Sequence, residues 1–233
     1  MTLQEKQNKL NELYKPFFNN VKDKVGDDIG QYGNPLLIDL AKTNNINTDV
    51  MIFGQETNTW YNGIKNIDEL IEIYSKFLND NLRSNTPFWQ CFRKWLGDEN
   101  GVYVWNNLSK MDYNSNGNRS ILGCPNEKIL EEILKESAKI IKKEIEIIEP
   151  KIIIFLSGPS YDFIIENYLG AKKKDNLEIA EIAEIAEENQ LCEFELKGFE
   201  NIKSFRTYHP RYLNISGDLK NKIVKFLRAK IYK

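Results

Sequence analysis

The chain has 233 residues, 41% of them hydrophobic and 12% aromatic, which is enough apolar material to bury the core of a globular domain. Its formal net charge of −2 argues against a protein that binds nucleic acid mainly through overall positive charge. The three cysteines, Cys91, Cys124 and Cys192, are widely spaced, which argues against a zinc site, an iron–sulfur cluster and a disulfide framework.

In chain order, hydrophobic patterning predicts strands and helices that alternate. The expected helices cover residues 3–20, 67–82, 87–96, 127–148, 161–169 and 219–232, and the expected strands cover 49–53, 102–105, 151–156 and 202–207. Apolar strands separated by helices are typical of a mostly parallel sheet with helices on both faces. We therefore predict an α/β fold, with a three-layer α/β/α arrangement around a central, mostly parallel four-stranded sheet.

The domain organisation follows from the same pattern. Residues 1–233 are expected to form a single domain, with an N-terminal helical extension at 1–48 and a surface insert at 171–199. The last part of the insert, 190–199, is compatible with an extra strand or hairpin. No apolar run is long enough to cross a bilayer, and the first residues lack the apolar segment of a signal peptide, so we expect a cytoplasmic protein with no membrane partner.

Open α/β sheets bind ligands outside the carboxyl ends of their strands, so the four loops at those ends are the candidates for a site. Glu56 comes directly after the first strand, where it could activate a water molecule or stabilise a developing cation, or could simply be a polar turn residue. Asn106 closes the second strand. Its amide offers a donor and an acceptor to the edge of a base, although asparagine is also a common turn former.

The other two loops follow the third and fourth strands. The turn Ser157-Gly158-Pro159-Ser160 lacks the glycine patterns of nucleotide-binding loops, which favours a helix cap and turn. His209, the only histidine, precedes Pro210, which keeps it out of helical geometry. Its place after a strand favours a role in the site. With no second histidine and no cysteine cluster, a metal-binding role is disfavoured.

Taken together, these four loops resemble the motifs of the uracil-DNA glycosylase superfamily, in order, over about residues 49–213. The corresponding segments are Gly54-Gln55-Glu56-Thr57-Asn58, Gly101-Val102-Tyr103-Val104-Trp105-Asn106, the strand and turn from Ile152 to Ser160, and His209-Pro210-Arg211-Tyr212-Leu213. The chain departs from the family pattern at Glu56, which replaces the usual aspartate or asparagine or, compared with the other branch, lies one position away from its acid. The proline that normally follows is missing. Arg211 and Tyr212 replace a Ser-Pro pair, and the four cysteines of the iron–sulfur branches are absent.

The resemblance implies an enzyme that flips a damaged base, uracil in the first place, out of DNA and cleaves its N-glycosidic bond without a cofactor or a metal. Glu56 would position the water, and a neutral His209 would donate a hydrogen bond to the departing base. The further roles fall on Gln55, Asn106 and one of Trp60, Tyr61 and Trp89 for binding the base, on Ser157, Ser160 and Arg211 for contacting nucleic acid, and on Leu213 for filling the gap in the stack. DNA, single- or double-stranded, is the expected partner, and the oligomeric state is left open.

Two other interpretations stay open. The chain could share the fold without glycosylase activity, as a nucleic-acid-binding protein or another N-glycosidic hydrolase. The net negative charge and the altered first motif favour keeping this interpretation. The chain could also be an unrelated flavodoxin-like or Rossmann-like domain, which the missing phosphate-binding loop disfavours.

Overall fold

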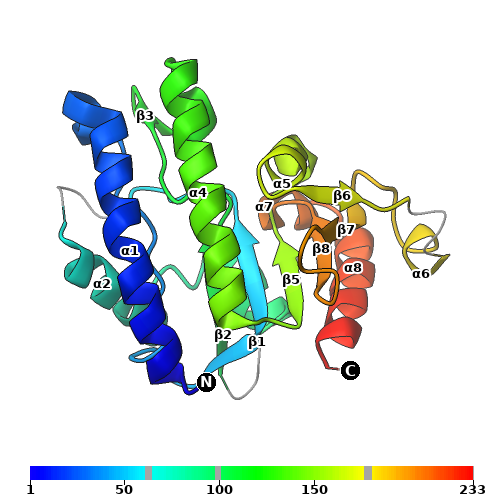
Figure 1. Cartoon of the computed structure of the whole chain (residues 1–233). Coiled ribbons are helices and arrows are strands. Elements are labelled where there is room, and N and C mark those ends of the chain that lie inside the picture. The colour runs from blue at the N-terminus through cyan, green and yellow to red at the C-terminus, as the bar shows by residue number, and fades with distance from the viewer. Residues whose placement is uncertain (61–64, 98–100, 176–179, 233) are drawn as a thin grey trace. The chain divides into compact units, whose positions relative to one another are not determined.

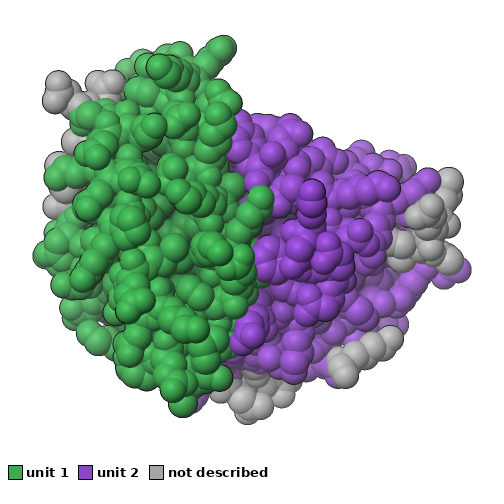
Figure 2. Space-filling view, viewed as in Figure 1, with its two compact units in different colours: residues 1–44, 55–80, 106–148 green, residues 45–54, 81–105, 149–233 purple. Residues whose placement is uncertain are grey.

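The computed structural model describes residues 1–60, 65–97, 101–175 and 180–232 (Figure 1). The chain divides into two compact units, each built from several segments (Figure 2). Unit 1 comprises residues 1–44, 55–80 and 106–148, and unit 2 comprises residues 45–54, 81–105 and 149–233. The expectation of a single domain with an extension at 1–48 and an insert at 171–199 stays a prediction.

Unit 1 is mainly helical. Its elements are α1 (Leu3–Val25), a 3₁₀ helix (Gly26–Gln31), α2 (Ile67–Asn79), the strands β3 (Asn114–Ser115) and β4 (Asn118–Arg119), a 3₁₀ turn (Ile121–Gly123) and α4 (Glu127–Ile148). The helices α1 and α4 lie side by side, and both bury one apolar stripe (Figure 1). The Lys6 ammonium of α1 donates to the carbonyl of Ile148 at 2.6 Å, which satisfies an orphan carbonyl at the C-terminus of α4.

Unit 2 carries the sheet. Its elements are β1 (Ile46–Gly54), α3 (Pro87–Gln90), a π-helical turn (Cys91–Trp95), most of β2 (Val102–Asn107), β5 (Ile152–Phe155), a 3₁₀ turn (Pro159–Tyr161), α5 (Asp162–Asn167), β6 (Ala171–Lys173), α6 (Ala180–Ala183), β7 (Leu191–Leu196), β8 (Lys203–Thr207), α7 (Pro210–Leu213) and α8 (Gly217–Ile231). The last two residues of β2 belong to unit 1.

In the described part of the chain, six strands form one sheet in the order β2-β1-β5-β8-β7-β6. β5 pairs in parallel with both β1 and β8, and all four of its residues are buried, as is typical of a parallel strand whose side chains are covered on both faces of the sheet. β7 and β6 pair antiparallel at one edge. The predicted α/β fold with a mostly parallel sheet is confirmed. The sheet is wider than the four strands predicted, because segment 171–199 adds β6 and β7.

A buried arginine fixes the edge of this sheet. Arg206 on β8 has no exposed side-chain surface, and its Nε and Nη2 donate to the two carboxylate oxygens of Asp162 at 2.7 and 2.8 Å. Its Nη1 and Nη2 also donate to the carbonyls of Asn189 and Glu188, at 2.8 and 3.1 Å. One side chain therefore attaches both α5 and the Glu-rich segment before β7 to β8.

Among the described helices, none combines the length and apolar character needed to cross a bilayer.

Replacing Asp162 by alanine is expected to lower the free energy of unfolding by about 3–5 kcal/mol, because it leaves a buried guanidinium without its counter-charge. Urea denaturation followed by circular dichroism measures this loss. The matched control is Asp49→Ala, which removes the exposed pair with Lys151 (2.7 Å) and is expected to cost no more than about 1 kcal/mol. Equal losses in the two variants would show that the Arg206 pair does not fix the sheet edge.

Candidate functional site

The loop after β1 carries the first predicted site residues, Gln55 and Glu56, and both are half-buried. The carbonyl of Gln55 accepts a hydrogen bond from the backbone amide of Ser109 at 2.9 Å. On the other side of Glu56, the Thr57 hydroxyl donates to a carboxylate oxygen of Asp112 at 3.2 Å. The structure therefore brings the first motif together with the segment that follows β2, as the sheet topology predicts.

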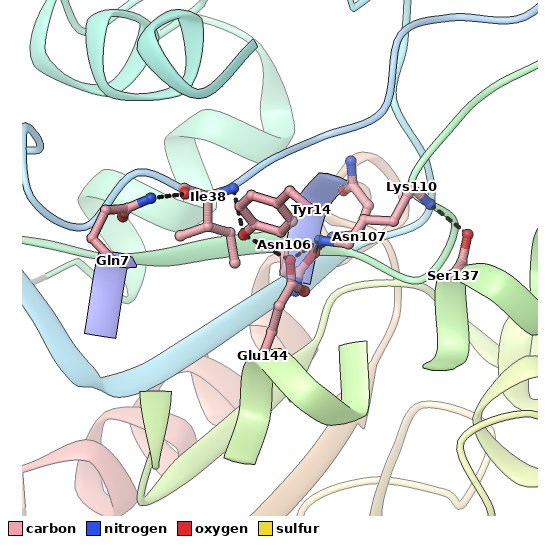
Figure 3. Close-up of polar contacts among 8 residues, drawn as sticks. All are labelled: Gln7, Tyr14, Ile38, Asn106, Asn107, Lys110, Ser137 and Glu144. Carbon is pink, nitrogen blue, oxygen red and sulfur yellow. Dashed lines mark hydrogen bonds and ion pairs between the residues drawn. The ribbon is translucent and has the colours of Figure 1, made fainter. Parts of the chain in front are cut away.

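Asn106 lies in a buried polar network of unit 1 (Figure 3). Its Nδ2 donates to Glu144 Oε2 at 2.8 Å, and its Oδ1 accepts from the Lys110 ammonium at 2.7 Å and from the amide of Asn107 at 2.8 Å. Lys110 also pairs with Glu144 Oε1 at 2.7 Å, and both of these side chains have 0% exposure. These partners fix the orientation of the Asn106 amide, with its oxygen toward Lys110 and its nitrogen toward Glu144.

Tyr14 extends this network to α1. Its hydroxyl donates to Glu144 Oε1 at 3.0 Å and accepts from the amide of Ile38 at 2.9 Å. Burial raises the pKa of Tyr14 well above its usual value, and the charge of Glu144 adds to this, so the phenol stays protonated. Burial also lowers the pKa of Lys110, against the opposing effect of Glu144. Asn106 is thus engaged by the interior of unit 1, and its binding of a base stays a prediction.

His209 follows β8 and caps the short helix α7 in unit 2. Its Nδ1 accepts a hydrogen bond from the amide of Arg211 at 3.3 Å, which places the proton of the neutral ring on Nε2. Burial, with a smaller contribution from the charge of Arg211, lowers the pKa of His209 to about 4. At neutral pH the ring is therefore uncharged and presents Nε2–H as a hydrogen-bond donor.

The turn after β5 and one aromatic ring accompany His209. Gly158 has φ +75°, and its amide donates to the carbonyl of Thr207 at 3.0 Å. A Cβ at residue 158 would lie 3.7 Å from the backbone nitrogen of His209. Ser157 before it is buried and Ser160 is exposed. The half-buried ring of Phe88 lies 6.3 Å from the His209 ring, centroid to centroid, with 23° between their planes.

Phe88 is the site residue that the sequence analysis missed. The sequence predicts a helix over 87–96, and the resemblance names Trp89, with Trp60 and Tyr61, as a ring that could bind the base. In the structure Trp89 and Phe92 are buried and pack together, while Phe88, whose ring packs on both of them, is only half-buried. Helical phase could not have identified Phe88, because Phe88 and Phe92 are four residues apart and share one face of the helix.

The remaining predicted residues are placed as follows. Trp60 makes a T-shaped contact with Phe77, and both Trp60 and Trp89 are buried, so in this conformation neither ring is accessible to a base. Tyr61 lies outside the described residues. Leu213 has 1% exposure, because the helical turn of α7 points it inward, and this runs against its expected insertion into a base stack. Arg211 is exposed, as a nucleic-acid contact requires.

The family model described as the Uracil DNA glycosylase superfamily matches residues 41–229, which is most of the chain. The chain belongs to this superfamily. No protein in a search of curated proteins matches it. Membership overturns the interpretation as an unrelated flavodoxin-like or Rossmann-like domain. It leaves open the choice between a superfamily member that cleaves a glycosidic bond and one that does not.

Two features of this superfamily member bear on its chemistry. Unit 1 holds Glu56 at the end of β1, and unit 2 holds His209 in a neutral, donor-presenting state. Within the described residues, no group of three or more His, Cys, Asp and Glu side chains is arranged to hold a metal ion. The chemistry that these side chains can supply is hydrogen-bond donation from His209 and placement of a water or a charge by Glu56.

The imidazole of His209 is expected to titrate at about pH 4, and because the chain has one histidine, the imidazole C–H resonances in NMR spectra report this residue alone. The unfolded chain takes up this proton near pH 6.5 and the native protein only near pH 4. Stability contributed by the neutral ring is therefore present above pH 6.5 and lost as the pH falls to about 4. In Arg211→Gln the midpoint is expected to rise slightly. A midpoint at the usual value would show that the ring is not desolvated.

Proposed function

We propose that the protein is a DNA glycosylase that flips a damaged base, with uracil as the preferred substrate, and hydrolyses its N-glycosidic bond. The observation that carries this proposal is the state of His209. Its ring is neutral, its Nδ1 is occupied by the Arg211 amide, and Nε2–H is therefore the available donor. Superfamily membership supports the class of reaction.

His209 would act on the leaving group. As the bond from C1′ to the base nitrogen breaks, the base departs with the electron pair, and negative charge develops on its carbonyl oxygen. A donor positioned before the reaction stabilises that charge without reorganisation. The half-buried ring of Phe88, which stacks with both Phe92 and His209, adds apolar surface beside His209 against which the extruded base could pack.

Glu56 would act on the sugar side, in the role that the resemblance implies. Its carboxylate would offset the positive charge that develops on the deoxyribose and would position the water whose oxygen attaches to C1′. The water supplies a hydroxyl to the sugar and a proton to solvent, and the departing base takes up a proton. The products are an abasic site and the free base, so no oxidant, metal or other co-reactant is needed.

We assign insertion into the duplex to Tyr212 and Ile215, which are close in sequence to the buried Leu213. Tyr212 is 63% exposed and Ile215 is 81% exposed, and both follow His209 on the surface of unit 2. Side chains that enter a base stack in place of an extruded nucleotide are apolar and accessible. The exposed Arg211 is available to contact a phosphate on the same segment.

A second candidate is a nucleic-acid-binding protein of the same fold that cleaves nothing. One observation favours it: the amide of Asn106, which the resemblance assigns to the base, already holds partners at both its oxygen and its nitrogen. The altered acid of the first motif, Glu56, points the same way. The two candidates differ in whether an abasic product forms.

The deciding assay incubates the protein with single- and double-stranded oligonucleotides that carry uracil, hypoxanthine or a mismatched thymine, followed by alkali to cleave abasic sites. His209→Ala is expected to lower kcat about 10²–10³-fold, the usual effect of losing one donor to a developing oxyanion. Glu56→Gln is also expected to lower kcat. Glu132→Gln, which removes an exposed carboxylate, is the control and should leave kcat unchanged. Binding of these oligonucleotides without any abasic product would favour the second candidate.

Tyr212→Ala and Ile215→Ala are expected to reduce activity on duplex substrates about tenfold more than on single strands, because only a duplex leaves a gap to be filled. Comparing kcat/KM on matched single- and double-stranded uracil substrates measures the difference. The control is Leu82→Ala, which shortens another exposed apolar side chain of unit 2 (39% exposed). Equal losses on both substrates would remove the assignment.

A further inference from the structure

We propose that Asp112 is a positioning residue that holds the first-motif loop in place and thereby fixes Glu56. The consequence for catalysis rests on the proposed function, whereas the anchoring itself does not. Asp112 lies in the loop between β2 and β3, has no assigned role in the motifs, and belongs with the first motif to unit 1.

The carboxylate of Asp112 is completely buried and binds the first-motif loop at two residues, Thr57 within the motif and Thr59 just after it. Its Oδ1 accepts from the Thr57 hydroxyl at 3.2 Å, and its Oδ2 accepts from the backbone amide of Thr59 at 2.9 Å. Arg119 supplies the counter-charge, with Nη1 at 3.3 Å from Oδ2. Because both carboxylate oxygens are engaged and shielded from solvent, Asp112 is suited to holding the loop and not to activating water.

The same segment holds the residue on the other side of Glu56. The amide of Ser109 donates to the carbonyl of Gln55 at 2.9 Å. Glu56 is therefore bracketed by Gln55 and Thr57, each tied to the segment 109–112. Groups that must act on a reacting atom need this kind of support, because a misplacement of about 1 Å can cost about 10²-fold in rate.

Thr59 shows that the loop needs an external restraint. Its φ is +55°, in the left-handed region that a β-branched residue rarely adopts. A backbone amide that donates to a carboxylate forms a strong, charge-assisted hydrogen bond, and the Asp112 carboxylate receives the Thr59 amide. Asp112 therefore stabilises a backbone conformation that Thr59 would leave if the carboxylate were absent.

Asp112 and the loop that carries it are held by further contacts within unit 1. Gly33 donates its amide to the Asp112 carbonyl at 3.0 Å, and a Cβ at residue 33 would overlap the Asp112 carboxylate. Two residues before Asp112, the backbone of Lys110 accepts from the Leu36 amide at 2.9 Å and donates to the Ser137 hydroxyl at 3.1 Å. The loop that carries Asp112 is thus fastened to the segment 33–36 and to α4.

The test uses the full chain with Asp112→Asn, which keeps the side-chain size and removes the charge. We expect kcat on the best substrate of the oligonucleotide assay to fall about 10–100-fold while KM changes less than about twofold, because the chemistry and not the binding is misplaced. Thr59→Gly removes the conformational conflict, so the double variant Asp112→Asn/Thr59→Gly should recover much of the lost kcat. Glu132→Gln, which removes an exposed carboxylate paired with Lys24, is the matched control.

A second measurement stands without any activity. Hydrogen exchange of the backbone amides at 55–60 should accelerate in Asp112→Asn, most strongly at Thr59, and stay unchanged in Glu132→Gln. If Asp112→Asn does not fold, Thr57→Val removes one of the two contacts at nearly constant shape and should give the same changes at smaller size.

The outcomes separate the two proposals. If the wild-type protein cleaves no substrate, the proposed function fails, and the exchange of the Thr59 amide still decides the anchoring. Unchanged exchange in both Asp112→Asn and Thr57→Val overturns the anchoring. Faster exchange with wild-type kcat overturns the positioning of Glu56. The positioning of Glu56 is also overturned if Thr59→Gly does not restore kcat and the loss of kcat runs in proportion to a lower melting temperature. That result would indicate a general loss of stability.

Discussion

The ion pair between Lys110 and Glu144 is the constraint on which unit 1 depends. Both side chains have 0% exposure, so each charged group has lost its hydration and is stabilised instead by the opposite charge and by hydrogen bonds. Such an exchange is tolerable only when the remaining lone pairs and protons are satisfied. Here Asn106 and Tyr14 complete the set, and they come from β2 and α1 (Figure 3). A single charge pair thus specifies how two helices and a strand end meet.

The strands were predictable from the sequence because their signal is local. The apolar runs at 49–53, 102–105 and 151–156 fall within or on β1, β2 and β5, and a helix over 127–148 coincides with α4. Buried parallel strands are continuous in apolar residues, and the residues themselves show it. The antiparallel strands β6 and β7 were less evident, because Glu and Lys residues flank and interrupt their apolar positions.

The candidate site was predictable in position and much less so in detail. The sequence pattern alone places Glu56 and His209 after strands and Asn106 at the end of one. The inward direction of Leu213 depends on the single helical turn that begins at Pro210, and the partial exposure of Phe88 depends on tertiary packing that leaves Phe92, on the same helical face, buried. The role of Asp112 arises from contacts with residues 33, 57 and 119, which no local pattern connects.

The residues before the family match have a consequence for how the domain is delimited. Likeness to the superfamily begins at residue 41, yet Lys6, Tyr14 and Gly33 already serve the matched part. They close the end of α4, satisfy Glu144 and make room for the Asp112 carboxylate. A fragment trimmed to the region of sequence likeness would therefore carry a buried carboxylate with a vacant hydrogen-bond position and an open end on its longest helix. The residues before residue 41 therefore belong structurally to unit 1, although the family model does not cover them.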